Sequence, residues 1–127
     1  YPISASSVVV PSDAKGVIVV GAVNNIDGVL EPFSSHGPTN NGISVPNVVG
    51  PNGVTTIAYN GDLFYGTSAT TPHVAGIVAL MLDVNSDITP AELLEKIQDN
   101  AKPEHTQTNY QNVYGFGIVD ASFIINE

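Results

Sequence analysis

The sequence contains no cysteine and no arginine. Without cysteine the chain cannot form disulfides, thiolate zinc sites or a cysteine nucleophile. Its three basic residues, Lys15, Lys96 and Lys102, stand against twelve Asp and Glu residues, which gives a formal net charge of −9. Because this charge repels a nucleic-acid backbone and an anionic membrane surface, we expect neither as a partner.

Long apolar runs are also missing. The longest apolar stretch, Val74–Leu82, is too short to span a bilayer. The chain begins at Tyr1 with neither an initiator Met nor a basic leader, so we expect Tyr1 to follow a cut made by a protease or by cloning. Hydrophobic residues make up 43% of the 127 residues, which is enough for one core and predicts a single domain.

Hydrophobic patterning predicts several strands. The continuous β-branched run at 17–23 is typical of a strand buried on both faces of a parallel sheet. Shorter strands are predicted at 45–49 and 54–58, within a region that is otherwise mostly loop. The turn sequence Asn-Gly-Asp at 60–62 then predicts a hairpin that leads into 63–65.

A buried helix is predicted to begin near Thr70 or Thr71 and to run to about Asp83. Pro72 fits the first turn because its missing N–H would have had no intrahelical partner there. From 74 to 82 the segment is apolar on every side, which is typical of a helix buried in the centre of a protein. We therefore expect this helix to be covered all round.

A second helix is predicted from Thr89 or the following proline to about Ala101. Thr89 and Glu92 have the spacing of a capping box, in which each side chain bonds the other residue's backbone N–H. Pro103 is expected to end the helix. A polar loop should follow, and the last apolar segment, 115–125, is expected to be partly helical.

The segment G-T-S-A-T-T-P-H-V-A-G at 66–76 places a serine at the mouth of the first helix. Gly66 allows a backbone conformation that other residues rarely adopt. Ser68 would lie where unpaired N–H groups and the helix dipole favour negative charge, such as the oxyanion of an acyl intermediate. On this geometry alone, capping of the helix by Ser68 or Thr70 is the more common role of such a residue.

The letters of this segment resemble the nucleophile motif of subtilisin-like serine proteases, the subtilases, commonly G-T-S-x-A-x-P-H-V-A-G. Thr70 stands where that family usually has alanine. Four further stretches are similar to family motifs in the same order, namely V-I-V-V-G-A-V at 17–23, F-S-S-H-G-P at 33–38, P-N-V-V-G-P-N-G at 46–53 and Y-G-F-G-I-V-D-A at 114–121. The third is looser because Asn47 replaces the usual Asp, Gly50 replaces the usual Ala, and Asn52 precedes the glycine.

Three other nucleotide-binding or hydrolase motifs do not fit. In the α/β-hydrolase elbow, G-x-S-x-G, the second glycine would stand where the chain has Thr70. A P-loop needs Gly-Lys followed by Ser or Thr, which does not occur. Gly115-x-Gly117 continues to Asp120 and not to a third glycine, so a dinucleotide fingerprint fails as well.

The resemblance implies an α/β fold, with a mostly parallel sheet flanked by helices, that forms the C-terminal portion of a subtilisin-like fold. It implies a serine endopeptidase in which Ser68 forms an acyl-enzyme with a peptide or protein substrate. The family's catalytic Asp and His segments, D-[ST]-G and H-G-T, precede the serine, and neither they nor the family's oxyanion Asn can be placed here. We therefore expect residues 1–127 to be the C-terminal part of a single catalytic domain, partnered by its N-terminal part and inactive alone.

The histidines and carboxylates are expected to have other roles. His73 follows the serine by five residues on the helix, so we expect it to pack or hydrogen-bond and not to act as the base. His36 and His105 lie in loops and are expected at the surface. No D-x-[DN]-x-[DN]-G segment occurs, so no cofactor is expected for catalysis, and the structural calcium known in the family has no support here.

Two alternatives stay open. The chain could belong to a non-catalytic subtilase-like scaffold or binding module, or to a two-chain enzyme cut before Tyr1 with both pieces in one fold. A lone half-sheet would expose an unpaired edge and an apolar face, which predicts association. The resemblance also implies secretion, whereas cleavage specificity depends largely on segments that precede Tyr1.

Overall fold

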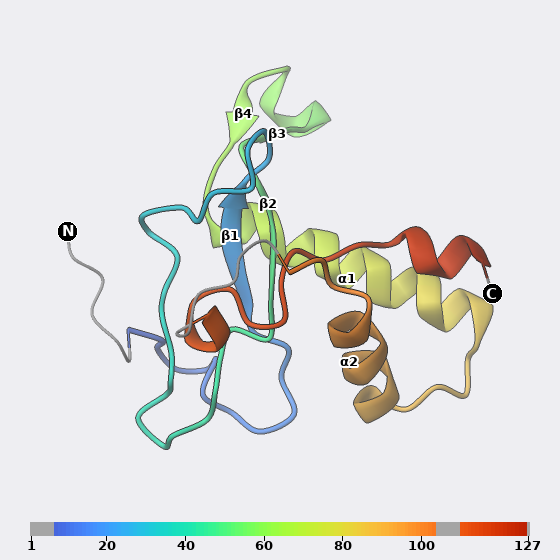
Figure 1. The fold of residues 1–127 in the computed structure, drawn as a ribbon. Coiled ribbons are helices and arrows are strands. Elements are labelled where there is room, and N and C mark those ends of the chain that lie inside the picture. Colours follow the sequence, from blue (N-terminus) through green and yellow to red (C-terminus); the bar gives the residue numbers. More distant parts are fainter. Residues whose placement is uncertain (1–6, 104–109, 127) are drawn as a thin grey trace.

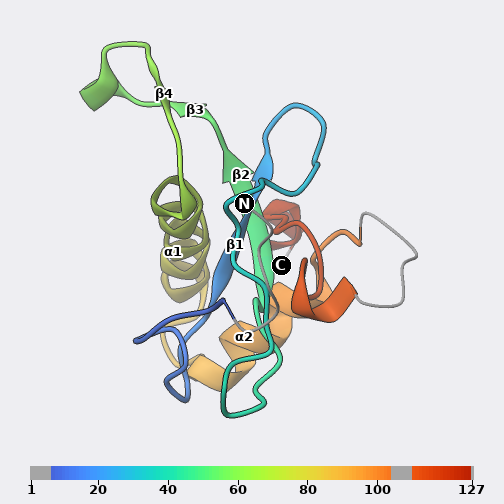
Figure 2. The ribbon, with the colours of Figure 1, turned by 90° about the vertical axis from the view of Figure 1, so that its left-hand side faces the viewer.

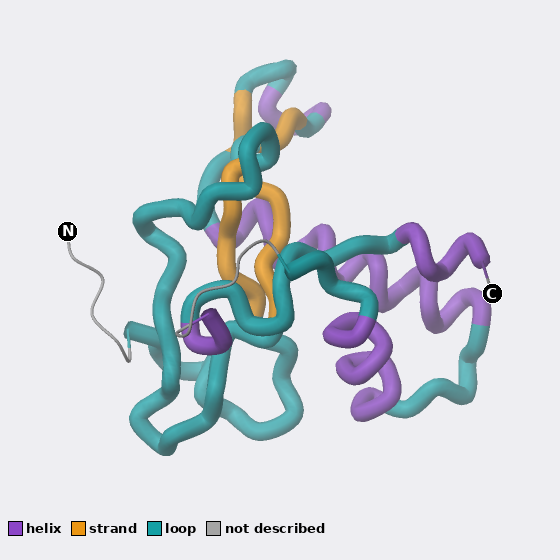
Figure 3. The backbone as a smooth tube through the Cα atoms, in the orientation of Figure 1, coloured by secondary structure: helices purple, strands orange, loops and turns teal. Residues whose placement is uncertain are grey.

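The computed structural model describes residues 7–103 and 110–126. In chain order its elements are β1 Val20–Asn24, β2 Val48–Asn52, β3 Val54–Thr55, η1 Ile57–Tyr59, β4 Leu63–Phe64, α1 Thr67–Val84, α2 Pro90–Asp99, η2 Tyr110–Asn112 and η3 Ser122–Asn126. Figure 1 shows these elements along the chain, and Figure 3 shows the long loop between β1 and β2 that the sequence predicted. The α/β class is confirmed.

The central sheet is parallel, as predicted. β1 pairs with β2 with Val20 opposite Val48, and the register continues to the ends of both strands. On the other edge of β2, the Val49 N–H donates to the Gly117 carbonyl at 3.0 Å, and the Val119 N–H donates to the Val49 carbonyl at 2.9 Å. The C-terminal segment thus extends the sheet beyond β2.

The strand boundaries differ from the predictions. β1 begins three residues into the predicted run 17–23, and β2 begins three residues after the predicted start of 45–49. The shift of β2 follows from Pro46, which has no N–H to donate to a ladder. Of the strand predicted at 54–58 only the first two residues pair, before η1 begins.

The predicted hairpin is confirmed. Val54 lies opposite Phe64, and Thr55 lies opposite Leu63. Asn60 adopts the left-handed conformation, with φ +51°, that such a turn requires. Figures 1 and 2 show the β3–β4 hairpin beyond the carboxyl ends of β1 and β2, at the opposite end of the sheet from α2.

Helix α1 begins at Thr67, three or four residues earlier than predicted, and is covered on one side only. Because of this earlier start, Pro72 lies inside the helix and not in the first turn, where the sequence predicted it. Its buried side chains are Ala69, Thr70, Val74, Ile77 and Met81. Within the described residues its other side is exposed, although it is also apolar, with Ala75, Ala79, Leu80, Leu82 and Val84. The expectation of a helix covered all round is therefore wrong for this structure, because an all-apolar pattern reports the helix's own surface and not what covers it.

The main hydrophobic core joins β2, α1 and α2. It consists of Val48, Val74, Ile77, Met81, Leu93 and Ile97. The predicted capping box of α2 is present: the Thr89 N–H donates to Glu92 Oε2 at 2.8 Å, and the Thr89 hydroxyl accepts from the Glu92 N–H at 3.3 Å. Hydrogen bonds from Thr89 lower the pKa of Glu92. The helix ends at Asp99, four residues before Pro103.

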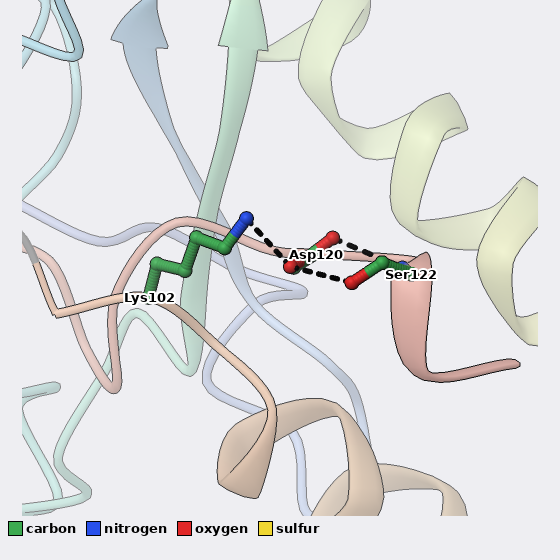
Figure 4. Close-up of polar contacts among 3 residues, drawn as sticks. All are labelled: Lys102, Asp120 and Ser122. Carbon is green, nitrogen blue, oxygen red and sulfur yellow. Dashed lines mark hydrogen bonds and ion pairs between the residues drawn. The ribbon is translucent and has the colours of Figure 1, made fainter. Parts of the chain in front are cut away.

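An ion pair fixes the C-terminal segment beside the end of α2. Lys102 Nζ lies 2.7 Å from Asp120 Oδ2, and the Ser122 N–H and hydroxyl both donate to the same carboxylate at 2.9 Å (Figure 4). These contacts lower the pKa of Asp120 to about 2, and the hydrogen bond with Lys102 has the largest effect. The η3 turn that follows confirms the partly helical end predicted from the sequence.

Candidate active site

Ser68 is the second residue of α1, and its side chain is exposed. Gly66, immediately before the helix, has φ +112°, a conformation that favours glycine and that the sequence predicted. Figures 1 and 2 show that α1 begins near the carboxyl ends of β1 and β2. In open α/β sheets ligands bind outside this end of the strands, so Ser68 lies where a substrate would be expected.

The structure does not give Ser68 or Thr70 a capping role. The N-cap residue is Gly66, and no side chain caps the helix. The Thr70 hydroxyl donates to the Thr67 carbonyl at 3.0 Å, so it bonds an acceptor and not one of the unpaired N–H groups. No hydrogen bond joins the Ser68 hydroxyl to another described residue. A hydroxyl in this state is available for chemistry.

The electrostatic setting of Ser68 suits a developing negative charge. α1 has 18 residues and no acidic side chain in its first turn. The first N–H groups of a helix lack intrahelical partners and form the positive end of its dipole. An oxyanion formed beside Ser68 would therefore meet N–H donors and a favourable field.

Neither of the two histidines that the structure describes, His36 and His73, is hydrogen-bonded to Ser68. The ring Nδ1 of His73 lies 2.8 Å from the Ala69 carbonyl oxygen, and because that oxygen can only accept, Nδ1 donates. This bond confirms His73 as a hydrogen-bonding residue. His36 is half-buried in a loop, and its backbone N–H and carbonyl both hydrogen-bond Ser7. The prediction for His105 lies outside the described residues.

Two residues that the sequence did not assign to the site hold the turn before Ser68. Asn52, the last residue of β2, is 0% exposed. Its Oδ1 accepts from the Gly66 N–H at 2.6 Å, and its Nδ2 donates to Glu31 Oε1 at 2.8 Å. The sequence contained one indication for Asn52, because this residue precedes the glycine of the third motif and departs there from the family pattern. It contained no indication for Glu31.

Residues 7–103 and 110–126 contain no group of three or more His, Asp or Glu side chains that could hold a metal ion. Within the same ranges, 7–103 and 110–126, neither α1 nor α2 combines the length and the apolar character that crossing a bilayer requires.

A family model described as the subtilase family matches residues 3–117. The chain belongs to the subtilase family. It is 33% identical to serine protease AprX of Bacillus subtilis over 87% of the chain and 30% of that protein. It is 34% identical to subtilisin J of Geobacillus stearothermophilus over 92% of the chain and 29% of that protein.

The fold is that of solved subtilases. The CspB protease of Clostridium perfringens superimposes with a TM-score of 0.80 at 27% identity, over 96% of the chain and 29% of that structure. The chain thus spans about 30% of the length of each of these three relatives. The prediction of an α/β fold that forms part of a subtilisin-like fold is confirmed.

Two departures from the subtilase pattern lie in contact. The pattern has alanine at both positions, whereas this subtilase has Gly50 in β2 and Thr70 in α1. Thr70 is 0% exposed. A Cβ added at Gly50 would lie 3.3 Å from both the Cβ and the carbonyl oxygen of Thr70. The atoms of Thr70 nearest to that added Cβ are its Cβ, carbonyl oxygen and Cα, all of which alanine would also have. Gly50 therefore lets β2 approach the backbone of α1 closely, whichever of the two residues stands at position 70.

This contact predicts additive effects of mutation at the two positions. Gly50→Ala alone should lower the free energy of unfolding by about 1–3 kcal/mol through overpacking. Thr70→Ala alone should cost about 1–2 kcal/mol through lost contacts and a small cavity. In urea unfolding of the full-length protein, the cost of the double variant should equal the sum within about 0.5 kcal/mol, because alanine at position 70 keeps every atom that the added Cβ would meet.

The control replaces the neighbouring Thr71, whose side chain is exposed. Gly50→Ala with Thr71→Ala should give additive costs, because the exposed Thr71 side chain does not share the buried contact between Gly50 and Thr70. A double variant of Gly50 and Thr70 that costs clearly less than the sum, while the pair with Thr71 stays additive, would show that the hydroxyl or methyl group of Thr70 crowds the added Cβ.

Proposed function

We propose that this chain supplies the nucleophile Ser68 to a serine endopeptidase. The observation that carries the proposal is the exposed Ser68 hydroxyl in the first turn of α1, after the positive-φ Gly66 and near the carboxyl ends of the strands. The nucleophile motif and the membership in the subtilase family support this role for the hydroxyl. The substrate is a peptide or protein.

In the proposed reaction, Ser68 Oγ attacks the carbonyl carbon of the scissile peptide bond. The hydroxyl proton passes to a general base, and the carbonyl oxygen becomes an oxyanion. The Ser68 backbone N–H lies at the unpaired start of α1 and donates to that oxyanion. The base then protonates the leaving amine, and water hydrolyses the acyl-enzyme. The base, its orienting carboxylate and the second oxyanion donor come from outside this chain.

The proposed partner is the N-terminal part of the same catalytic domain. The exposed side of α1 carries Ala75, Ala79, Leu80 and Leu82, which are typical of a helix buried on both sides. A chain that spans about 30% of its relatives leaves ample length elsewhere in such a protein to cover that side. Secretion, and catalysis without a metal or cofactor, are part of this proposal.

The test compares two polypeptides under one assay. Residues 1–127 alone should not hydrolyse a chromogenic peptide above the buffer rate, because the base is missing. The full-length polypeptide that contains this chain should hydrolyse the same peptide. Hydrolysis by residues 1–127 alone would contradict the claim that the general base lies outside this chain. An inactive full-length polypeptide that contains D-[ST]-G and H-G-T segments would contradict the role of Ser68, and one that lacks them would be the non-catalytic scaffold.

A further inference from the structure

We infer that Asn52, anchored by Glu31, is a positioning residue that sets the location of Ser68 by fixing the turn at Gly66. The inference rests on the proposed role of Ser68 as nucleophile. Asn52 does not reach a substrate, since its side chain is fully buried and both of its polar atoms are bonded within the protein. It acts only through the backbone that leads to Ser68.

The turn at Gly66 is fixed on both sides of the residue. Its N–H donates to Asn52 Oδ1 at 2.6 Å, and its carbonyl accepts from the Ala69 N–H at 2.8 Å. Its φ is +112°, a conformation that glycine can adopt because it has no Cβ. Because Ser68 follows by two residues, a rotation at Gly66 would displace the Ser68 hydroxyl.

Asn52 is itself held by the sheet and by Glu31. It is paired within β2 opposite Asn24, and its carbonyl accepts from the Asn25 N–H at 3.2 Å. The Glu31 N–H donates to the Ala22 carbonyl of β1 at 2.9 Å, so the backbone of Glu31 is tied to β1. The carboxylate of the same residue accepts from Asn52 Nδ2. The contacts therefore connect both strands to the first residue before α1.

The chemistry of the partners fixes the orientation of the Asn52 amide. A backbone N–H can only donate, so the amide oxygen must face Gly66. The Glu31 carboxylate accepts, so the amide nitrogen must face Glu31. A buried amide with both ends bonded resists rotation, since any other orientation leaves a buried polar group unpaired.

The effect on catalysis follows from the tolerance of nucleophilic attack. A displacement of about 1 Å at the reacting atom can cost about 100-fold in rate. A positioning role for Asn52 predicts a loss in kcat with little change in KM, because substrate binding does not involve this buried side chain. A purely structural role would lower stability and leave the kcat of the folded molecules unchanged.

The test exchanges the two functional groups in the full-length protein. Asn52→Asp keeps an acceptor for Gly66 but places a second carboxylate against Glu31, so kcat should fall about 100-fold at nearly constant KM. Glu31→Gln alone retains an acceptor and should stay within about tenfold. In the double variant the amide introduced at position 31 can donate to the carboxylate introduced at position 52, which again accepts from the Gly66 N–H. Its kcat should therefore return to within about tenfold of the wild type.

Active-site titration gives the concentration of competent molecules in each sample, so kcat is compared per folded enzyme. Asn100→Asp, the same change at an exposed position at the end of α2, is the control and should leave kcat unchanged. If Asn52→Asp does not fold, Glu31→Ala takes its place and should lower kcat about tenfold.

A wild-type kcat in Asn52→Asp, or a loss that the double variant does not recover while it folds normally, would overturn the inference and leave the proposed function standing. A wild-type full-length protein without hydrolytic activity would overturn the proposed function, and the inference with it. The two failures are therefore distinct.

Discussion

Replacing Ser68 by alanine is expected to lower the kcat of the full-length protein by about three orders of magnitude or more. The change removes the oxygen that forms the acyl-enzyme, and the other members of the site cannot replace it. Since Ser68 is exposed and caps nothing, the variant should fold with an unchanged thermal midpoint. The measurement is peptide hydrolysis alongside thermal unfolding.

Thr71→Ala is the matched control for this change. Thr71 is exposed in the same turn of α1, and its hydroxyl donates to the Thr67 carbonyl at 2.9 Å. Removing that hydroxyl should change kcat by less than about twofold, because a bond within the helix contributes little. A Ser68→Ala protein that retained activity comparable to Thr71→Ala would show that another residue is the nucleophile.

Replacing Gly115 by alanine is expected to lower the free energy of unfolding by about 3 kcal/mol or more. Gly115 has φ +63°, and a Cβ there would lie 2.2 Å from the Asn47 carbonyl oxygen and 2.4 Å from that of Pro46. Both contacts are with backbone, which cannot move aside without disturbing the entry to β2. The cost combines backbone strain with overpacking. Urea unfolding of the full-length protein measures it.

Gly42→Ala separates these two causes. Gly42 has φ +78°, but an added Cβ would meet nothing within 4 Å. It should therefore cost only the backbone strain, about 1–2 kcal/mol. Equal costs for Gly115→Ala and Gly42→Ala would mean that the close approach to Asn47 has no energetic weight.

These distances give a physical reason for a motif that the sequence could only match by letter. In Y-G-F-G-I-V-D-A, an added Cβ at Gly117 would lie 2.3 Å from the Lys102 carbonyl oxygen, just as one at Gly115 meets Asn47. Both glycines let the C-terminal segment approach backbone closely on its way to the edge of β2. The resemblance identified the motif, whereas the physical need for its glycines comes from contacts between segments that are distant in the sequence.

Helix α1 shows how far local patterning reaches. The sequence predicted its existence and the glycine conformation before it. It placed Pro72 in the first turn, which is wrong, because the helix begins at Thr67 and Pro72 is its sixth residue. It also predicted cover on every side, which the described residues do not provide. An apolar surface is a property of the helix itself, but its cover belongs to other segments, and in this proposal those segments lie in the rest of the protein.

Only part of the candidate site could be predicted, because local sequence does not report contacts between distant segments. Ser68 could be identified because its motif is contiguous in the sequence. The contacts of Asn52 with Gly66 and Glu31 could not, since they span 14 and 21 positions and depend on the register of β1 and β2. Gly50 and Thr70 each stood out as departures, and only the packing of α1 on β2 showed that they lie against each other.

The most direct measurement of the central claim is the site of covalent labelling by a fluorophosphonate in the full-length protein. This reagent phosphonylates a serine only where a base and an oxyanion site activate it. After digestion, mass spectrometry of the peptide that contains Gly66–Gly76 should place a single adduct on Ser68, and none should form on the separate chain of residues 1–127. An adduct on a different residue, or none in a full-length protein that hydrolyses peptides, would contradict the account.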